Sequence, residues 1–208
     1  MRVLVVTPHP DDETFCCGGS ILNHLRRGDE VYVDVVTDGR YGSPDQQLRG
    51  SEELVRIRTR EIECALSVLG VDKANVRYLG FEDGRVKSRR REAQEALRWR
   101  IKELSPEIVY SPVPFDMHDD HATLGKITLG LFPRARFYII WVPTSLDPRR
   151  RGLVYLRKWS KVIVDIEGYR ETKLRAMKCY SSQLGGLSGD MMRRFTGKTE
   201  TFYQLVRS

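Results

Sequence analysis

Short apolar runs alternate along this chain with longer stretches in which apolar residues recur every three or four positions. The first run, Val3 to Val6, is continuous, which is typical of a strand buried on both faces of a parallel sheet. Apolar residues at helical spacing follow in Ser20–Arg27, and Val31–Thr37 is a second apolar run. This order of strand, helix and strand predicts a βαβ unit.

The same alternation continues through the rest of the sequence. It predicts an α/β fold, a single-domain Rossmann-like three-layer sandwich with a mostly parallel sheet, over residues 1–208. Helices are expected at Glu52–Leu69, Arg89–Leu104, Ala122–Leu131 and Gly168–Cys179, strands at Val76–Leu79, Ile108–Ser111, Arg136–Val142 and Lys161–Asp165, and a flexible link at Gly185–Gly189 before the tail Phe195–Val206.

Polar residues gather directly after the first strand, in Pro8-His9-Pro10-Asp11-Asp12-Glu13. The two prolines end the strand and stiffen the backbone around His9. Neighbouring carboxylates repel one another and lose hydration when buried, and a divalent cation among them would remove that cost. A His and an Asp three positions apart suit zinc, which accepts nitrogen and oxygen ligands. The alternative is that His9 and Asp12 only cap the helix that follows.

A second acid-rich cluster, Asp116-Met117-His118-Asp119-Asp120-His121, follows the apolar run at Ile108–Ser111. Three of the four histidines therefore lie in two turns that each follow an expected strand; the fourth, His24, lies on a helix. Loops at the carboxyl ends of parallel strands share one edge of the sheet, so the two turns can meet. Three protein ligands and a water form an open, catalytic zinc site. The alternative for His118 and His121 is a helix-capping or surface position.

These motifs together resemble those of a known family. The segment PHPDDE with Gly18-Gly19, the later HDDH at His118–His121, the Arg58–Glu61 segment, Leu79–Gly84 and Lys173–Gln183 are similar to the PIG-L/LmbE-like family of zinc-dependent N-deacetylases. The resemblance covers most of the chain. It implies an LmbE-like fold and hydrolytic removal of an acetyl group from an amino sugar such as an N-acetylglucosamine derivative.

The resemblance also implies roles for individual residues. His9, Asp12 and His121 are expected to hold Zn²⁺, although another divalent metal would serve. Asp11 is the expected general base, and a protonated His118 would stabilise the oxyanion. Either of these two would then protonate the leaving amine.

Three further positions are expected to support the site. Asp120 would orient His118 or its neighbouring loop, a role for which Asp116 and Asp119 could compete. Arg58 is expected to contact the substrate, but Arg56 and Arg60 leave the register open and a surface salt bridge is the alternative. Asp83 could accept hydrogen bonds from sugar hydroxyls, or could simply belong to an Asp-Gly turn.

Two rival functions remain open. A metal-dependent phosphohydrolase could use Asp11, Asp12, Asp116 and Asp120, but magnesium sites usually contain more carboxylates than histidines. A basic, non-enzymatic anion-binding module would suit the net charge of +7 but would leave the two acid-and-histidine turns unexplained. Nucleophilic catalysis is not indicated, because the sequence has no Gly-x-Ser-x-Gly elbow or Cys-His arrangement.

Composition limits the remaining choices. The basic runs Arg89–Arg91 and Arg149–Arg151 are interpreted as solvated faces, and no nucleic-acid role is expected because no aromatic-interleaved basic strand accompanies them. Scarce Asn and abundant Arg suit a thermophile. No run is long enough for a membrane span, and no signal peptide is visible, so a cytoplasmic location is expected. The connection Pro143–Arg151 is interpreted as a surface loop or a homo-oligomer contact, and Cys16, Cys17, Cys64 and Cys179 as reduced core residues.

Overall fold

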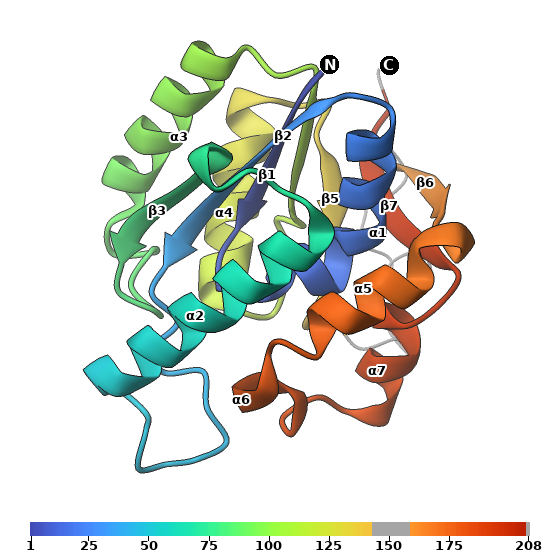
Figure 1. The fold of residues 1–208 in the computed structure, drawn as a ribbon. Coiled ribbons are helices and arrows are strands. Elements are labelled where there is room, and N and C mark those ends of the chain that lie inside the picture. The colour runs from blue at the N-terminus through green and yellow to red at the C-terminus, as the bar shows by residue number, and fades with distance from the viewer. Residues whose placement is uncertain (143–158, 207–208) are drawn as a thin grey trace.

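A computed structural model of the chain describes residues 1–142 and 159–206 (Figure 1). Within these residues, seven strands form one sheet in the order β3-β2-β1-β4-β5-β7-β6. The strands from β3 to β5 pair in parallel, whereas β7 pairs antiparallel with both β5 and β6. The strands are β1 (Arg2–Thr7), β2 (Glu30–Thr37), β3 (Val76–Phe81), β4 (Ile108–Pro112), β5 (Arg136–Tyr138), β6 (Trp159–Asp165) and β7 (Thr199–Leu205).

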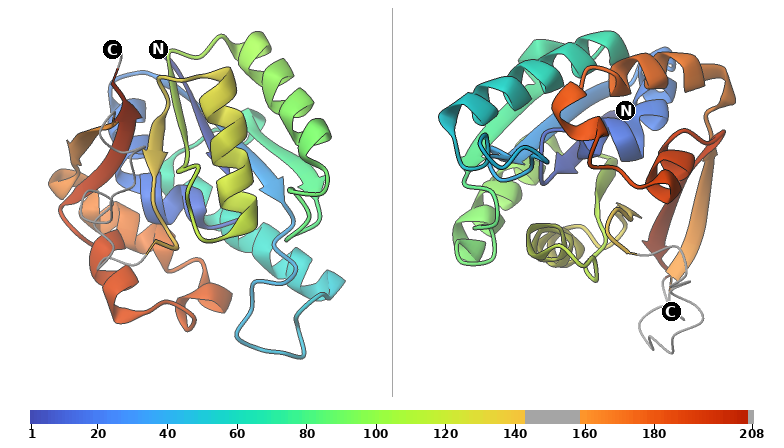
Figure 2. Two further views of the ribbon diagram at one scale, coloured as in Figure 1. Left: turned by 180° about the vertical axis from the view of Figure 1, so that it is seen from behind. Right: turned by 90° about the horizontal axis from the view of Figure 1, so that it is seen from below.

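Helices cover both faces of this sheet, so the expected three-layer α/β architecture is confirmed (Figure 2). The helices α1, α2 and α5 pack on one face, and α3 and α4 pack on the other (Figures 1 and 2). The helices are α1 (Asp12–Arg26), α2 (Glu52–Leu69), α3 (Arg90–Leu104), α4 (Asp119–Leu131), α5 (Arg170–Met177), α6 (Ser181–Leu184) and α7 (Gly189–Phe195).

The apolar run of β1 feeds a separate core on each face of the sheet. Val3 and Val5 belong to the core beneath α1, α2 and α5, and Leu4 and Val6 to the core beneath α3 and α4. All four side chains are fully buried, because successive side chains of a strand point to opposite faces. A continuous apolar run is therefore what a central parallel strand requires.

Helix α1 begins at Asp12, well before the expected start at Ser20. The Gly18-Gly19 pair lies inside the helix instead of preceding it. A Cβ on Gly19 would lie 2.5 Å from Cγ2 of Ile166, and one on Gly18 would lie 3.1 Å from Cγ of Lys173. The groups that pack closely against the two glycines are therefore side chains, and not the backbone that the sequence led us to expect.

The C-terminal region differs most from expectation. Strand β5 ends at Tyr138 rather than Val142, because the amides of Ile140 and Trp141 turn away and donate to Asp116 Oδ2 at 3.3 Å. Of the expected flexible link at Gly185–Gly189, the first four residues connect two short helices, α6 and α7, and Gly189 begins α7. Expectations for Pro143–Arg151, including the basic run Arg149–Arg151, concern residues outside those that the structure describes.

A buried ion pair fastens the last strand to α1 and α5. Lys173 Nζ lies 2.8 Å from Glu200 Oε1, and both side chains are almost fully buried. Glu200 also accepts hydrogen bonds from the amides of Gly19 and Ser20 and from the Ser20 hydroxyl. These contacts hold α1 in place, with the metal-motif residue Asp12 at its start.

Replacing Lys173 by Met should lower the free energy of unfolding by about 3–5 kcal/mol, because it leaves a buried carboxylate without its counter-ion. Lys178→Met, at an exposed position one turn further on, is the matched control and should change it by less than about 0.5 kcal/mol. Urea unfolding of the three proteins measures the difference. Equal midpoints for the two variants would show that the pair adds nothing to stability.

One expectation about the cysteines is wrong. Cys64 on α2 and Cys179 directly after α5 form a disulfide, with their Cα atoms 5.9 Å apart. The two helices pack side by side, so residues 115 positions apart in sequence come within bridging distance. Cys16 and Cys17 are free and buried, as expected. No helix among the described residues has the length and apolar character needed to cross a membrane.

Candidate metal centre and active-site pocket

The two acid-and-histidine turns meet at the carboxyl edge of the sheet. Strands β1 and β4 are neighbours, and their following helices, α1 and α4, lie on opposite faces. The strand order reverses at this point, which is where open α/β sheets bind their ligands. His9 and Asp12 come from the turn after β1, and His121 comes from the first turn of α4.

Three donor atoms from these residues form a compact triangle. His9 Nδ1 lies 3.1 Å from His121 Nε2 and 3.4 Å from Asp12 Oδ2, and His121 Nε2 lies 3.3 Å from Asp12 Oδ2. Ligands that surround a zinc ion tetrahedrally at about 2.0–2.2 Å lie about 3.3–3.6 Å from one another. The three side chains are buried. Their spacing and their two-nitrogen, one-oxygen chemistry therefore fit one divalent metal.

Further carboxylates lie behind the two histidines. His9 Nε2 lies 3.0 Å from Asp83 Oδ1 and 3.5 Å from Asp120 Oδ2, and His121 Nδ1 lies 3.9 Å from Asp116 Oδ2. Carboxylates within hydrogen-bonding distance orient metal-binding imidazoles, as Asp83 can for His9. Asp116 is too far from His121 Nδ1 for a hydrogen bond, and that nitrogen has no hydrogen-bond partner among the described residues. His9 with Asp83 and Asp120, and His9 with His118 and His121, also bring donor atoms within 4.8 Å of one another.

The electrostatics of this cluster favour positive charge. Burial disfavours the charged form of His9, but the carboxylates of Asp12, Asp120 and Asp83 outweigh it and raise the pKa of His9 well above its usual value. Burial also acts to raise the pKa of Asp12, but the positive charges of His121 and His9 outweigh it and lower that pKa. Such stabilisation of positive charge is what a cation-binding site requires.

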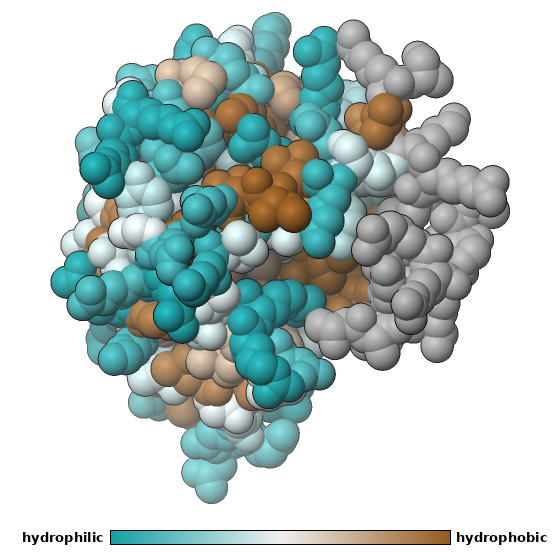
Figure 3. Space-filling view, turned by 90° about the vertical axis from the view of Figure 1, so that its right-hand side faces the viewer, coloured by the Kyte–Doolittle hydropathy of each residue, from teal (hydrophilic) through white to brown (hydrophobic). Residues whose placement is uncertain are grey.

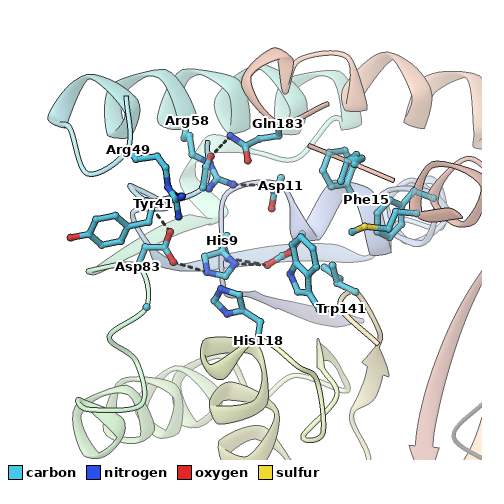
Figure 4. A pocket seen from close by; sticks show the side chains of 17 residues that line it. His9, Asp11, Phe15, Tyr41, Arg49, Arg58, Asp83, His118, Trp141 and Gln183 are labelled. Carbon is cyan, nitrogen blue, oxygen red and sulfur yellow. Dashed lines mark hydrogen bonds and ion pairs between the residues drawn. The ribbon is translucent and has the colours of Figure 1, made fainter. Parts of the chain in front are cut away.

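Asp11 lies beside the triangle and faces the cavity (Figure 4). Arg58 Nη2 donates to Asp11 Oδ2 at 2.7 Å. Burial raises the pKa of Asp11 to about 8, although Arg58 opposes that rise. The backbone of Asp11 has φ 155°, ψ −32°, which is rare for a residue other than glycine, and such strain is concentrated at functional sites.

Arg58 is buried, and its two terminal nitrogens bind the backbone around Asp11. Besides Asp11, it donates to the carbonyl oxygens of Pro10 at 2.8 Å and Gly39 at 3.0 Å. A Cβ on Gly39 or Gly42 would lie 2.6 or 2.3 Å from Arg58 Nη1, so a larger residue at either position would displace the guanidinium from this arrangement. Arg56 and Arg60 are exposed, and of the three arginines only Arg58 lines the pocket.

His118 is the N-cap residue of α4, and its Nδ1 accepts the amide of Asp120 at 3.3 Å. The helix-capping alternative therefore holds for His118, and the side chain also lines the cavity. Burial, together with the positive charges of His9 and His121, lowers the pKa of His118. Asp120 contacts His118 through its backbone, while its carboxylate accepts the amides of Gly84 and Val86 at 2.7 and 3.1 Å.

Asp83 points toward His9 (Figure 4) and accepts the amide of Tyr41 at 3.1 Å. Burial acts to raise the pKa of Asp83, but His9 outweighs it and the pKa is lowered. In this arrangement Asp83 joins the loop after β2 to His9.

The cavity above these residues has a volume of about 240 Å³, and its walls include side chains that the motifs did not indicate. One wall comes from the loop after β2, and the other is largely apolar (Figure 4). The additional lining residues are Phe15, Tyr41, Arg49, Ile140, Trp141, Gln183, Leu187, Met191 and Phe195. Of these only Gln183 belongs to a quoted motif, and the others lie outside the residues that the motifs specify.

Glu61 holds the end of the Lys173–Gln183 motif beside the cavity. This residue of α2 accepts hydrogen bonds from the amide and hydroxyl of Ser182 at 2.7 and 2.6 Å and from the hydroxyl of Ser181. Gln183 Nε2 then donates to the carbonyl of Gly42 at 2.6 Å. Glu61 therefore positions α6 against the loop after β2.

Comparison with known proteins places this geometry in context. The sequence model of the PIG-L family, described as GlcNAc-PI de-N-acetylase, matches residues 4–132. A probable N-acetyl-α-D-glucosaminyl L-malate deacetylase 2 of Bacillus anthracis is 27% identical over 99% of this chain and 92% of its own length. The diacetylchitobiose deacetylase of Thermococcus kodakarensis is 31% identical over 88% of this chain and 70% of its own length.

A solved structure shows the same fold. The N,N′-diacetylchitobiose deacetylase of Pyrococcus horikoshii, in complex with an inhibitor, aligns with a TM-score of 0.74 and 26% identity. The alignment covers 97% of this chain and 82% of that one.

Proposed function

The chain belongs to the PIG-L family and is an enzyme that removes N-acetyl groups, and we propose that it acts on a derivative of N-acetylglucosamine with a divalent metal held by His9, Asp12 and His121. We further propose that residues 1–208 form one catalytic domain. The observation that carries the proposal is the triangle of donor atoms at the floor of a cavity that also exposes Asp11 and His118.

Zinc is the metal that this donor set suits best, since two imidazole nitrogens and one carboxylate oxygen are its usual ligands. When bound, such an ion polarises a carbonyl and lowers the pKa of a water molecule from 15.7 to about 7. The protein contributes the fixed position of the three donors. Asp83 and Asp120 contribute by orienting the His9 imidazole.

Asp11 is the general base in this proposal. Arg58 binds Oδ2 and fixes the carboxylate, and Oδ1 is left to accept a proton from the attacking water. A base whose pKa lies near neutrality can both take this proton and return it to the leaving amine, and burial moves the pKa of Asp11 in that direction. Arg58 thus acts through Asp11 as a positioning residue.

His118 is suited to stabilise the oxyanion as a neutral imidazole. Because its Nδ1 accepts the Asp120 amide, the proton of the neutral ring lies on Nε2. Nε2–H can then donate to the carbonyl oxygen of the acetyl group as negative charge develops there. The lowered pKa of His118 favours this neutral form over the imidazolium expected from sequence.

The cavity walls suit a sugar ring. Tyr41 and Trp141 are 41% and 44% exposed, although both line the cavity, so their rings are accessible to a ligand. Aromatic side chains with an apolar face and a polar edge suit a substrate such as a sugar, which has both apolar faces and hydroxyl groups. The phosphohydrolase alternative is less favoured, because two of the three triangle donors are nitrogen.

Acetate release from N-acetylglucosamine and N,N′-diacetylchitobiose tests this function. Protein stripped of metal should release no acetate, and one equivalent of zinc should restore release. The control substrate is p-nitrophenyl phosphate. Phosphate release from it, without acetate release from either sugar, would replace the proposal by the phosphohydrolase alternative.

A further inference from the structure

We propose that the natural substrate carries an anionic group, a carboxylate or phosphate, on its aglycone, and that Arg49 binds this group. The inference rests on the proposed function, because it concerns the same cavity and an N-acetylglucosamine derivative. The inference rests on Arg49 because, among the described residues, it is the one charged side chain lining the cavity that has no oppositely charged partner.

The carboxylates that line the cavity are all engaged. Asp11 is paired with Arg58, Asp12 with His9 and His121, and Asp83 with His9. Arg58 in turn donates from Nη1 and Nη2 to Asp11 and two backbone carbonyls, and its Nε is buried away from the cavity surface. These charges are therefore committed to building the site and are not free to bind a substrate.

Arg49 differs from them. It lies on the loop between β2 and α2, and Figure 4 shows it on the same side of the cavity as Tyr41 and Arg58, away from Phe15 and Trp141. Its Nε donates to the Tyr41 carbonyl at 3.1 Å, and its Nη1 is 3.4 Å from Gln46 Oε1. Neither partner is charged, and no hydrogen bond to Nη2 occurs within the described residues.

The same loop shows that an arginine there can be neutralised. Arg40 lies 2.7 Å from Asp38 and 3.1 Å from Glu52, so its charge is balanced within the protein. Arg49 has comparable reach but no such partner. Because Nε is fixed on a backbone carbonyl, the guanidinium is preorganised and its remaining donors suit the two oxygens of a carboxylate or phosphate.

The placement of Arg49 distinguishes the aglycone from the acetyl group. The metal triangle, Asp11 and His118 occupy the floor, where the acetyl carbonyl must bind, whereas Arg49 lies at the exposed rim of the cavity. The apolar wall has no side-chain hydrogen-bond donor for an anion at Leu187, Met191 and Phe195. A negative group would therefore be directed to the Arg49 side.

The test compares three α-linked derivatives of N-acetylglucosamine: the neutral methyl glycoside, the carboxymethyl glycoside and the 1-phosphate. Wild-type enzyme, Arg49→Met and Arg60→Met are assayed for KM and kcat, and binding is measured independently by calorimetry. Arg60 is the matched control, because it is an exposed arginine on α2 that does not line the cavity. The two anionic compounds show whether a carboxylate or a phosphate fits better.

We expect Arg49→Met to raise KM and the dissociation constant for the preferred anionic compound by about 10- to 100-fold, with little change in kcat, as loss of charged hydrogen bonds does. Values for the methyl glycoside, and all values for Arg60→Met, should stay within about threefold of wild type. Hydrolysis of all three compounds with equal KM in wild type and Arg49→Met would overturn the inference and leave the proposed function intact. Tight, Arg49-dependent binding of an anionic compound without acetate release would overturn the proposed function instead.

Discussion

Asp11→Asn should lower kcat by about 10²- to 10⁴-fold while leaving the bound zinc unchanged. The amide keeps the size of the side chain but cannot accept the proton of the attacking water. Arg58 still binds the side-chain oxygen, so the turn that carries His9 should keep its shape. Steady-state acetate release measures kcat, and metal analysis of the same samples measures the zinc content.

Asp119→Asn is the matched control for this substitution. Asp119 lies in the second acidic cluster, but its side chain is exposed and pairs with Lys87. Its replacement should leave kcat within about twofold of wild type, as expected for an exposed ion pair. If Asp11→Asn kept more than a tenth of the wild-type kcat with full zinc content, Asp11 would not be the base.

His121→Asn should weaken zinc binding by more than about 100-fold, a larger loss than the 10- to 100-fold typical of residues that only orient a metal ligand. The reason is geometric, because His9 and Asp12 alone supply two donors instead of three. Competition with a chromophoric chelator measures the affinity. Acetate release should fall in parallel and should recover in part at high zinc concentrations.

His24→Asn is the control for losing a buried histidine. His24 binds Asp29 and Tyr110 with its two ring nitrogens and does not line the active-site cavity. This variant should lose stability but retain wild-type zinc affinity. Wild-type zinc affinity in His121→Asn would shift the metal to the neighbouring set formed by His9, Asp83 and Asp120.

The ends of a helix could be predicted from sequence where capping residues mark them. Helix α2 runs from Glu52 to Leu69 as expected, because Ser51 Oγ accepts the Leu54 amide at its start and Gly70 takes a positive φ at its end. The start of helix α1 earlier than Ser20 could not be predicted, because the first turns, from Asp12 to Gly19, contain two glycines and lack a clear apolar periodicity. The two glycines are explained by residues far away in sequence, because a Cβ there would crowd the side chains of Ile166 and Lys173.

The meeting of His9, Asp12 and His121 could be predicted from sequence because a general rule places the ends of parallel strands at one edge. No comparable rule indicates that Arg58 binds Asp11, or that Cys64 reaches Cys179, since both contacts depend on how α2 packs. The apolar wall of the cavity was also missed. Leucine, methionine and phenylalanine after Gly186 have the same appearance in sequence whether they fill a core or line a pocket.

The most direct test of the central claim is the position of the metal. Crystals of the zinc-loaded enzyme, measured at wavelengths on either side of the zinc absorption edge, would locate the ion by its anomalous scattering. We expect one peak per chain, at about 2.0–2.2 Å from His9 Nδ1, Asp12 Oδ2 and His121 Nε2. A peak between Asp83 and Asp120 without one in this triangle, or no peak in the cavity at full activity, would contradict it.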